Sequence, residues 1–156
     1  MKLNYIIIPL ITILTALSGS LLTSRAMGWY KNINKPSWTP PGSLIGAVWT
    51  VIFILAMISA LIVWNDSISS VQVGRFKLII AIFILNAVLN VFWSLLFFNQ
   101  HLLAPAIFEA GLLGASVIAL VILIWPFSAL AASLLIPYAA WVSFATFLTY
   151  KVWSLN

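Results

Sequence analysis

The chain has 156 residues, of which 64% are hydrophobic and 6% are charged, and its mean hydropathy is +1.18. A soluble domain of this size needs a more highly charged surface, so the composition indicates an integral membrane protein. The formal net charge of +5 comes from basic residues that form no dense cluster, which argues against nucleic-acid binding. The lack of cysteine excludes disulfides and thiolate chemistry, and two acidic residues with one histidine predict no metal site.

Five apolar stretches are long enough to cross a bilayer, for which a helix needs about 20 residues. The predicted spans are 4–23, 43–64, 78–98, 104–124 and 130–150. Breakers and charged residues collect between them, and we expect no appended soluble domain. We therefore predict an all-α integral membrane protein. Residues 1–156 form a single bundle of five transmembrane helices, with a long ordered loop, 24–42, after the first helix.

The first span has an alternative interpretation, because Lys2, an apolar core and "ALSGS" (16–20) also resemble a signal peptide. The apolar run is long for that purpose, and its removal would take away the N-terminal anchor. With five spans the termini lie on opposite faces of the membrane. A small excess of basic residues on the face of the loop 24–42 favours a cytoplasmic position for that loop and the C-terminus.

Polar and aromatic side chains inside the spans gather toward the loop 24–42. At a rise of about 1.5 Å per residue, they fall in the half of the membrane nearest that loop or at its floor. They form helical faces made of Asn86, Asn90, Trp93 and Phe97 on the third span, Tyr138, Trp141, Ala145 and Leu148 on the fifth, and Trp49 with Phe53 on the second. These faces predict one shared pocket, and ordinary packing between helices is the alternative.

The fourth span carries small residues and an acid. Ala110 with Gly114, and Gly111 with Ala115, are spaced for close helix approach, either within the bundle or across a dimer. Glu109 lies within the span, where an acid suggests a functional role. It is also close enough to the end of the span to reach lipid headgroups or to bond a neighbouring helix.

Several stretches resemble the TspO/MBR family, the tryptophan-rich sensory proteins of bacteria and their mitochondrial translocator relatives. They are "WYKNINKPSWTPPG" (29–42), Trp49, "NVFWSLLFF" (90–98) and "LLIPYAAWVSFATFLTYKVWSLN" (134–156). The resemblance implies five transmembrane helices, commonly a homodimer, and a pocket beneath the first loop. It also implies that the pocket binds tetrapyrroles such as protoporphyrin IX, or other apolar molecules, and we expect the protein in a bacterial cytoplasmic membrane.

The resemblance also assigns individual residues. Tyr30, Asn90 and Ala145 fall at pocket positions of the family. Trp49 and Trp141 match tryptophans that some bacterial members need for light- and oxygen-dependent porphyrin degradation, and they would be catalytic here if that reaction occurs. We predict a binding protein or sensor with porphyrin as ligand and no required cofactor, and porphyrin degradation and transport are alternatives. The cholesterol motif of the mammalian branch lacks its basic residue here, so we predict no cholesterol binding.

A porphyrin is a flat apolar disc with carboxylate tails, so its site needs aromatic faces, polar anchors and cations where the carboxylates emerge. The predicted ligand-binding residues are Tyr30, Trp38, Trp49, Phe53, Asn86, Asn90, Trp93, Tyr138, Trp141 and Ala145, and the predicted carboxylate-binding residues at the pocket mouth are Arg25, Lys31 and Lys35. Such loop cations also commonly contact membrane lipid headgroups.

The stretch "KPSWTPPG" (35–42) is the most unusual part of the loop. Pro36 restricts Lys35 to extended geometry, and Pro40 and Pro41 stiffen the chain before the second span. Trp38 gives the stretch an apolar surface to bury. Since a long structureless loop in a compact bundle is usually functional or disordered, we predict that this stretch is the rigid half of a lid over the pocket.

Overall fold

The computed structural model describes residues 3–66 and 73–156, and the described residues contain helices and no strand. The long apolar helices are α1 (Asn4–Arg25), α3 (Gly42–Asp66), α4 (Val73–Ser94) continued by the π-helix η2 (Leu95–Asn99), α5 (Leu103–Ile124), and α6 (Ala129–Ser133) followed by α7 (Ile136–Ser154). They give five candidate membrane spans by length and composition. The predicted fold class, an all-α protein with five spans, is confirmed.

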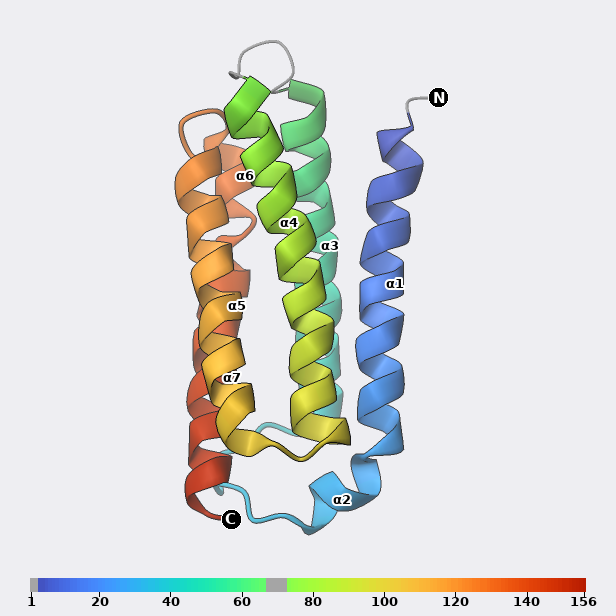
Figure 1. The fold of residues 1–156 in the computed structure, drawn as a ribbon, viewed down its shortest axis with the longest axis vertical. Coiled ribbons are helices and arrows are strands. Elements are labelled where there is room, and N and C mark those ends of the chain that lie inside the picture. Colours follow the sequence, from blue (N-terminus) through green and yellow to red (C-terminus); the bar gives the residue numbers. More distant parts are fainter. Residues whose placement is uncertain (1–2, 67–72) are drawn as a thin grey trace.

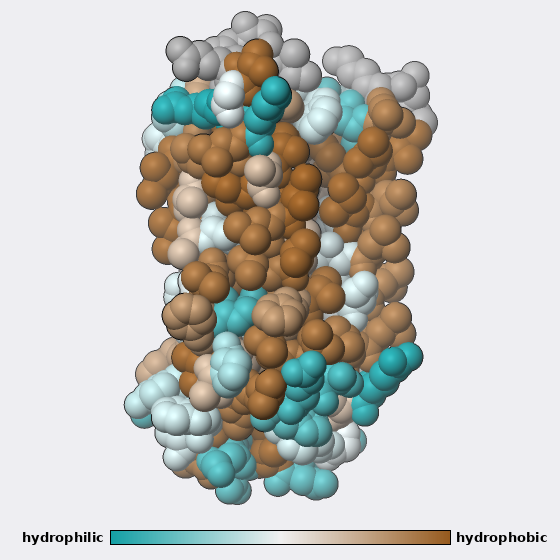
Figure 2. All heavy atoms as spheres, in the orientation of Figure 1, coloured by the Kyte–Doolittle hydropathy of each residue, from teal (hydrophilic) through white to brown (hydrophobic). Residues whose placement is uncertain are grey.

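The helices run up and down through a single bundle with its two termini at opposite ends (Figure 1). The short helix α2 (Met27–Asn32) crosses one end, which is also the end where the C-terminus lies. Hydrophobic residues form a belt around the middle of the visible face, and hydrophilic residues gather toward the ends (Figure 2). This distribution matches a multi-pass protein whose belt faces lipid.

The segment 24–42 is more ordered than a loop. Helix α1 continues to Arg25, and α2 follows after the single residue Ala26, which is buried. The α2 helix ends at Asn32, and the backbone becomes extended at Ile33. The ammonium group of Lys35 donates hydrogen bonds to backbone carbonyls at this helix end, including that of Ile33 at 2.9 Å. A charge at a helix C-terminus satisfies carbonyls that lack helical partners, which explains why α2 stops here.

The third and fifth spans each contain an irregular turn. In η2 the backbone N–H of Gln100 donates to the carbonyl of Leu95 at 2.9 Å, a wider turn than that of an α-helix. In the fifth span, α6 ends at Ser133 and α7 begins at Ile136. Pro137 lies in the first turn of α7, where its missing N–H costs no helical hydrogen bond. The chain is therefore broken just before the proline and is regular after it.

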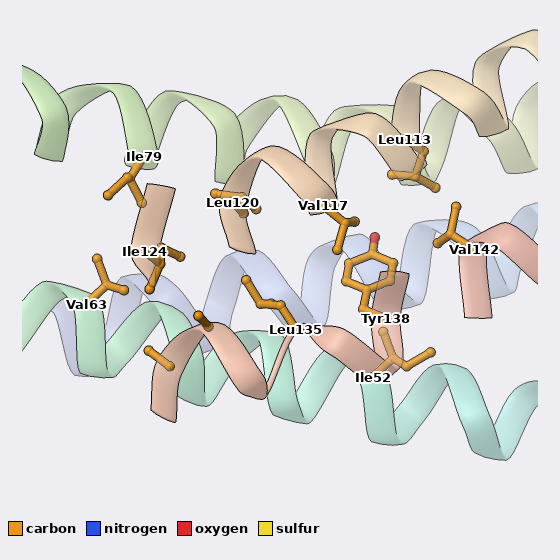
Figure 3. Packing of buried hydrophobic residues seen from close by; sticks show 12 residues of the cluster. Ile52, Val63, Ile79, Leu113, Val117, Leu120, Ile124, Leu135, Tyr138 and Val142 are labelled. Carbon is orange, nitrogen blue, oxygen red and sulfur yellow. The ribbon is translucent and has the colours of Figure 1, made fainter. Parts of the chain in front are cut away.

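A dense apolar core fills the space among α3, α4, α5, α6 and α7. Ile79, Ile124 and Leu135 are fully buried within it. In Figure 3 the ring of Tyr138 lies near Val117 and Leu135 of the same cluster, with its hydroxyl pointing away from Ile52. Among the described residues of α1, none belongs to this core cluster. Helix α1 packs instead against α3, α4 and η2, and this looser packing leaves room for a cavity.

Helices α5 and α7 approach each other closely at Gly114. A Cβ atom added there would lie 3.4 Å from Cγ1 of Val142, and Ala110 one turn earlier is buried. This pair of small residues therefore serves packing within the bundle. Gly111 and Ala115 are exposed on the outer surface of α5, and the predicted homodimer stays a prediction.

We expect Gly114→Leu to destabilise the bundle by about 1–3 kcal/mol, because the larger side chain must push α5 away from Val142. Gly114→Ala is the matched control, since one methyl group fits at ordinary van der Waals distance and favours the helix. Thermal unfolding in detergent measures both. An unchanged thermal unfolding midpoint for Gly114→Leu would show that α5 and α7 can accommodate a larger side chain at their contact.

Candidate functional site

A cavity of about 980 Å³ lies among α1, α3, α4, η2 and α7, and α2 covers one end of it. Its volume is at the upper end of the range for ligand pockets, about 300–1,000 Å³. Pro9 and Ser24 of α1 both line it, so it extends about 22 Å along that helix at 1.5 Å per residue. The cavity therefore reaches beyond the half of the membrane in which the sequence placed the pocket.

The α1 wall of the cavity is built from small side chains. Thr12, Ala16, Gly19 and Thr23 recur at helical spacing and all line the cavity. The hydroxyl of Thr12 donates to the carbonyl of Ile8 at 3.0 Å, and that of Thr23 to the carbonyl of Gly19 at 2.9 Å. Because these hydroxyls donate their hydrogens within their own helix, the α1 wall presents a nearly apolar surface of small side chains to the cavity.

The opposite walls are aromatic and come from three helices. Trp49 lies 5.7 Å from Phe53 on α3, measured between ring centroids. Trp93 of α4 stacks on Phe97 of η2 at 5.0 Å with an interplanar angle of 15°. Trp141 lies 5.2 Å from Phe144 on α7, and Ala145 lines the same wall. The structure thus brings the predicted residues Trp49, Phe53, Trp93, Trp141 and Ala145 to one cavity.

The indole nitrogens of Trp93 and Trp141 are buried and have no hydrogen-bond acceptor among the described residues. Packing alone therefore positions these two rings. Glu109 is 3% exposed, and neither of its carboxyl oxygens has a partner in the described part of the chain. The alternative that it reaches headgroups or bonds a neighbouring helix is therefore not what the structure shows.

A buried hydrogen-bonded chain stands behind the aromatic wall. Asn90 donates to the hydroxyl of Tyr138 at 3.1 Å, and Tyr138 donates to Oδ1 of Asn86 at 3.0 Å. Asn86 in turn donates to the hydroxyl of Ser116 at 2.9 Å. Of these residues Asn90 lines the cavity, whereas Asn86, Ser116 and Tyr138 lie outside its lining. Asn86 and Tyr138, predicted as direct ligand contacts, are placed where they hold Asn90.

Helix α2 closes the end of the cavity nearest the C-terminus. Tyr30 lines the cavity and packs edge-on against Phe98 at 5.6 Å between ring centroids. Trp29 stacks on His101 at 4.0 Å, which joins α2 to the turn after η2. Burial raises the pKa of the Tyr30 hydroxyl above its ordinary value, so this group stays neutral at physiological pH. The part of the segment that covers the cavity is therefore α2.

The stretch 35–42 lies differently from the prediction. Only Gly42 of this stretch is among the cavity-lining residues in the described structure, and Trp38 stacks on Phe147 of α7 at 5.7 Å instead. Trp38 is 46% exposed, and it also packs edge-on against Phe144, which lines the cavity, at 5.9 Å between ring centroids. Trp38 therefore holds the stretch 35–42 against α7 beside the cavity without lining it. The hydrophobic character of Trp38 was readable from the sequence, but the surface that it covers was not.

The three predicted cations also lie outside the cavity lining. Lys35 uses its ammonium hydrogens on backbone carbonyls at the end of α2, and it sits 4.8 Å from the centroid of the Tyr30 ring. Its contacts in the structure are therefore those of a capping residue. Arg25 and Lys31 are exposed near the end of the cavity that α2 covers. Carboxylate binding by these residues stays a prediction.

The structure adds a contact that the sequence did not indicate. The backbone N–H of Asn34 donates to Oδ1 of Asn156 at 3.0 Å, and Nδ2 of Asn156 donates to the carbonyl of Asn34 at 2.9 Å. Nδ2 of Asn34 also donates to the carbonyl of Leu155 at 3.1 Å. We call this pair the Asn34–Asn156 clasp. It ties the segment after α2 to the end of α7, and no local pattern signals it.

The fold and the cavity together define a class, that of multi-pass helical membrane proteins with a partly open apolar cavity of ligand size. Residues 6–154 match the model of the TspO/MBR family, and the chain belongs to that family. It is 33% identical to the tryptophan-rich protein TspO of Bacillus cereus over 156 residues, covering 100% of this chain and 99% of that protein. It is 30% identical to the human translocator protein over 132 residues, covering 85% of this chain and 77% of that protein.

Proposed function

We propose that the protein binds tetrapyrroles such as protoporphyrin IX, or other flat apolar molecules of similar size, as a membrane-embedded binding protein or sensor. The observation that carries this proposal is the convergence of Trp49, Trp93 and Trp141, from three different helices, on one cavity of about 980 Å³. Aromatic rings that are already packed bind a flat apolar ligand without further ordering, so little conformational entropy is lost.

The polarity of the cavity supports the same ligand class. Its walls are aliphatic and aromatic, and Asn90 supplies an amide anchor at the α4 wall. A ligand with carboxylate tails would turn them toward the α2 end, where Arg25 and Lys31 are exposed to solvent. The apolar disc would then lie among the tryptophans, and the charged groups would stay hydrated.

Titration with protoporphyrin IX in detergent is expected to quench tryptophan fluorescence to saturation. Trp141→Phe should weaken the apparent affinity, because it removes an indole from the cavity wall and leaves a smaller ring. Trp125→Phe is the matched control, since Trp125 is 51% exposed and lies outside the cavity lining. Quenching that never saturates, and that is identical in the Trp49→Phe/Trp141→Phe double variant, would refute the proposal.

A further inference from the structure

The hydrogen-bonded chain behind the cavity wall has a direction. Its members are Asn90 and Asn86 on α4, Tyr138 on α7 and Ser116 on α5, and each of these side chains is at most 7% exposed. Amides and hydroxyls can both donate and accept, so the chain could run either way. The direction decides which end of the Asn90 amide faces the cavity.

The fixed end of the chain is the backbone carbonyl of Leu113. The hydroxyl oxygen of Ser116 lies 2.7 Å from that carbonyl oxygen, and a carbonyl can only accept. Ser116 must therefore donate its single hydrogen to Leu113, and it is left as an acceptor for Asn86. A contact of 2.7 Å between two oxygens without a hydrogen between them would be repulsive.

Each later link follows from the one before. Since Ser116 accepts, Asn86 presents its NH₂ group to Ser116 and its Oδ1 to Tyr138. Tyr138 then donates its only hydrogen to Asn86 and accepts from the NH₂ group of Asn90. The Oδ1 atom of Asn90 remains, and none of the hydrogen bonds of the described residues ends on it. It is not one of the sealed, unpartnered polar atoms of the described residues, and Asn90 lines the cavity.

We infer that the chain fixes the Oδ1 atom of Asn90 as a hydrogen-bond acceptor at the cavity wall, and that the cavity selects flat apolar ligands with a donor there, such as a ring N–H. This inference rests on the proposed function and specifies its ligand class. Ser116 does not line the cavity, yet it sets the direction of the whole chain. Ser116 is thus a positioning residue for ligand selectivity, acting through Asn86, Tyr138 and Asn90.

Carbazole and dibenzofuran test this inference, because they have nearly the same shape and only carbazole carries a ring N–H. Calorimetric titration of each probe into the detergent-solubilised protein gives an affinity ratio, and comparing ratios between variants cancels partitioning into micelles. We expect the wild type to favour carbazole about three- to tenfold, the range that one net hydrogen bond supports. Ser116→Ala and Tyr138→Phe break different links of the chain, and each should bring the ratio close to one.

Ser59→Ala is the matched control. The Ser59 hydroxyl is also fully buried and donates to a backbone carbonyl, that of Ala131 at 2.8 Å, but it belongs to no link of the chain. It should keep the wild-type ratio, and Ser116→Thr, which keeps a hydroxyl, should restore it. Equal affinity of the wild type for both probes, or a ratio unchanged in both Ser116→Ala and Tyr138→Phe, overturns the inference while the proposed function stands. Failure of the wild type to bind either probe counts against the proposed function itself.

Discussion

A Gly46→Phe variant is expected to fold like the wild type and to bind protoporphyrin IX at least about tenfold more weakly, which corresponds to about 1.4 kcal/mol. Gly46 lines the cavity on α3, one turn before Trp49 and two turns before Phe53. A Cβ atom added at Gly46 meets no other atom within 4 Å, so a larger side chain has space without displacing a neighbour. The new ring would occupy the space beside Trp49 that the ligand needs.

The stability of this variant should not fall, because replacing a helical glycine removes an entropic cost of about 0.5–1 kcal/mol. Gly111→Phe is the matched control, since Gly111 also lies within a spanning helix with open space around it but outside the cavity lining. Fluorescence titration gives the affinities, and thermal unfolding gives the stabilities. Wild-type affinity in Gly46→Phe would place the ligand elsewhere in the protein.

The spans and the aromatic wall were predictable because each depends on short-range patterns. Inside a bilayer the backbone must satisfy its own hydrogen bonds, so an apolar stretch of sufficient length becomes a helix whatever its neighbours do. Once the helices are placed, spacing assigns side chains to faces, and Trp49, Trp93 and Trp141 do line one cavity. The sequence predicted a pocket that extends less deeply into the membrane than the cavity does. The α1 side of the cavity is formed by small residues such as Ala16 and Gly19, and these give no polar or aromatic pattern that would mark them as cavity-lining.

The sequence did not show which polar residues line the cavity and which lie behind its wall. Asn86 and Asn90 are one helical turn apart and look equivalent in the sequence, yet only Asn90 lines the cavity. The difference arises from the position of Ser116 on α5 and of Tyr138 on α7, which bind the two ends of the Asn86 amide. Such a distinction depends on how three helices meet, and a spacing argument within one helix contains no information about it.

Within the segment 24–42, Tyr30 lines the cavity as predicted, whereas Lys35 and Trp38 lie outside its lining. Lys35 caps α2, and Trp38 packs on Phe144 and Phe147 of α7. The stretch 35–42 contains a turn in which the backbone N–H of Thr39 donates to the carbonyl of Pro36 at 3.0 Å. The predicted rigidity of the stretch stays a prediction. The surface that the stretch covers depends on α7, which lies far away in the sequence.

The Asn34–Asn156 clasp leads to the second large expected effect. A ligand that leaves through the end covered by α2 requires the segment after α2 to move away from α7. Asn156→Ala removes both hydrogen bonds between the Asn156 side chain and the backbone of Asn34. Each such bond contributes about 0.5–1.5 kcal/mol net. We therefore expect protoporphyrin IX to dissociate about tenfold faster from the variant, as measured by stopped-flow displacement.

Ser154→Ala is the matched control for this experiment. Ser154 is exposed near the same end of α7, and its hydroxyl donates to the carbonyl of Lys151 within the helix, so its loss leaves the clasp intact. Thermal stability should stay unchanged in Ser154→Ala and should fall in Asn156→Ala by no more than its two lost hydrogen bonds contribute, because the clasp lies at the surface and outside the core. A dissociation rate that is unchanged in Asn156→Ala would mean that the ligand leaves by another route. The next route to test would then be between α1 and its neighbouring helices. Few residues of α1 are buried, so this helix is the one most easily displaced.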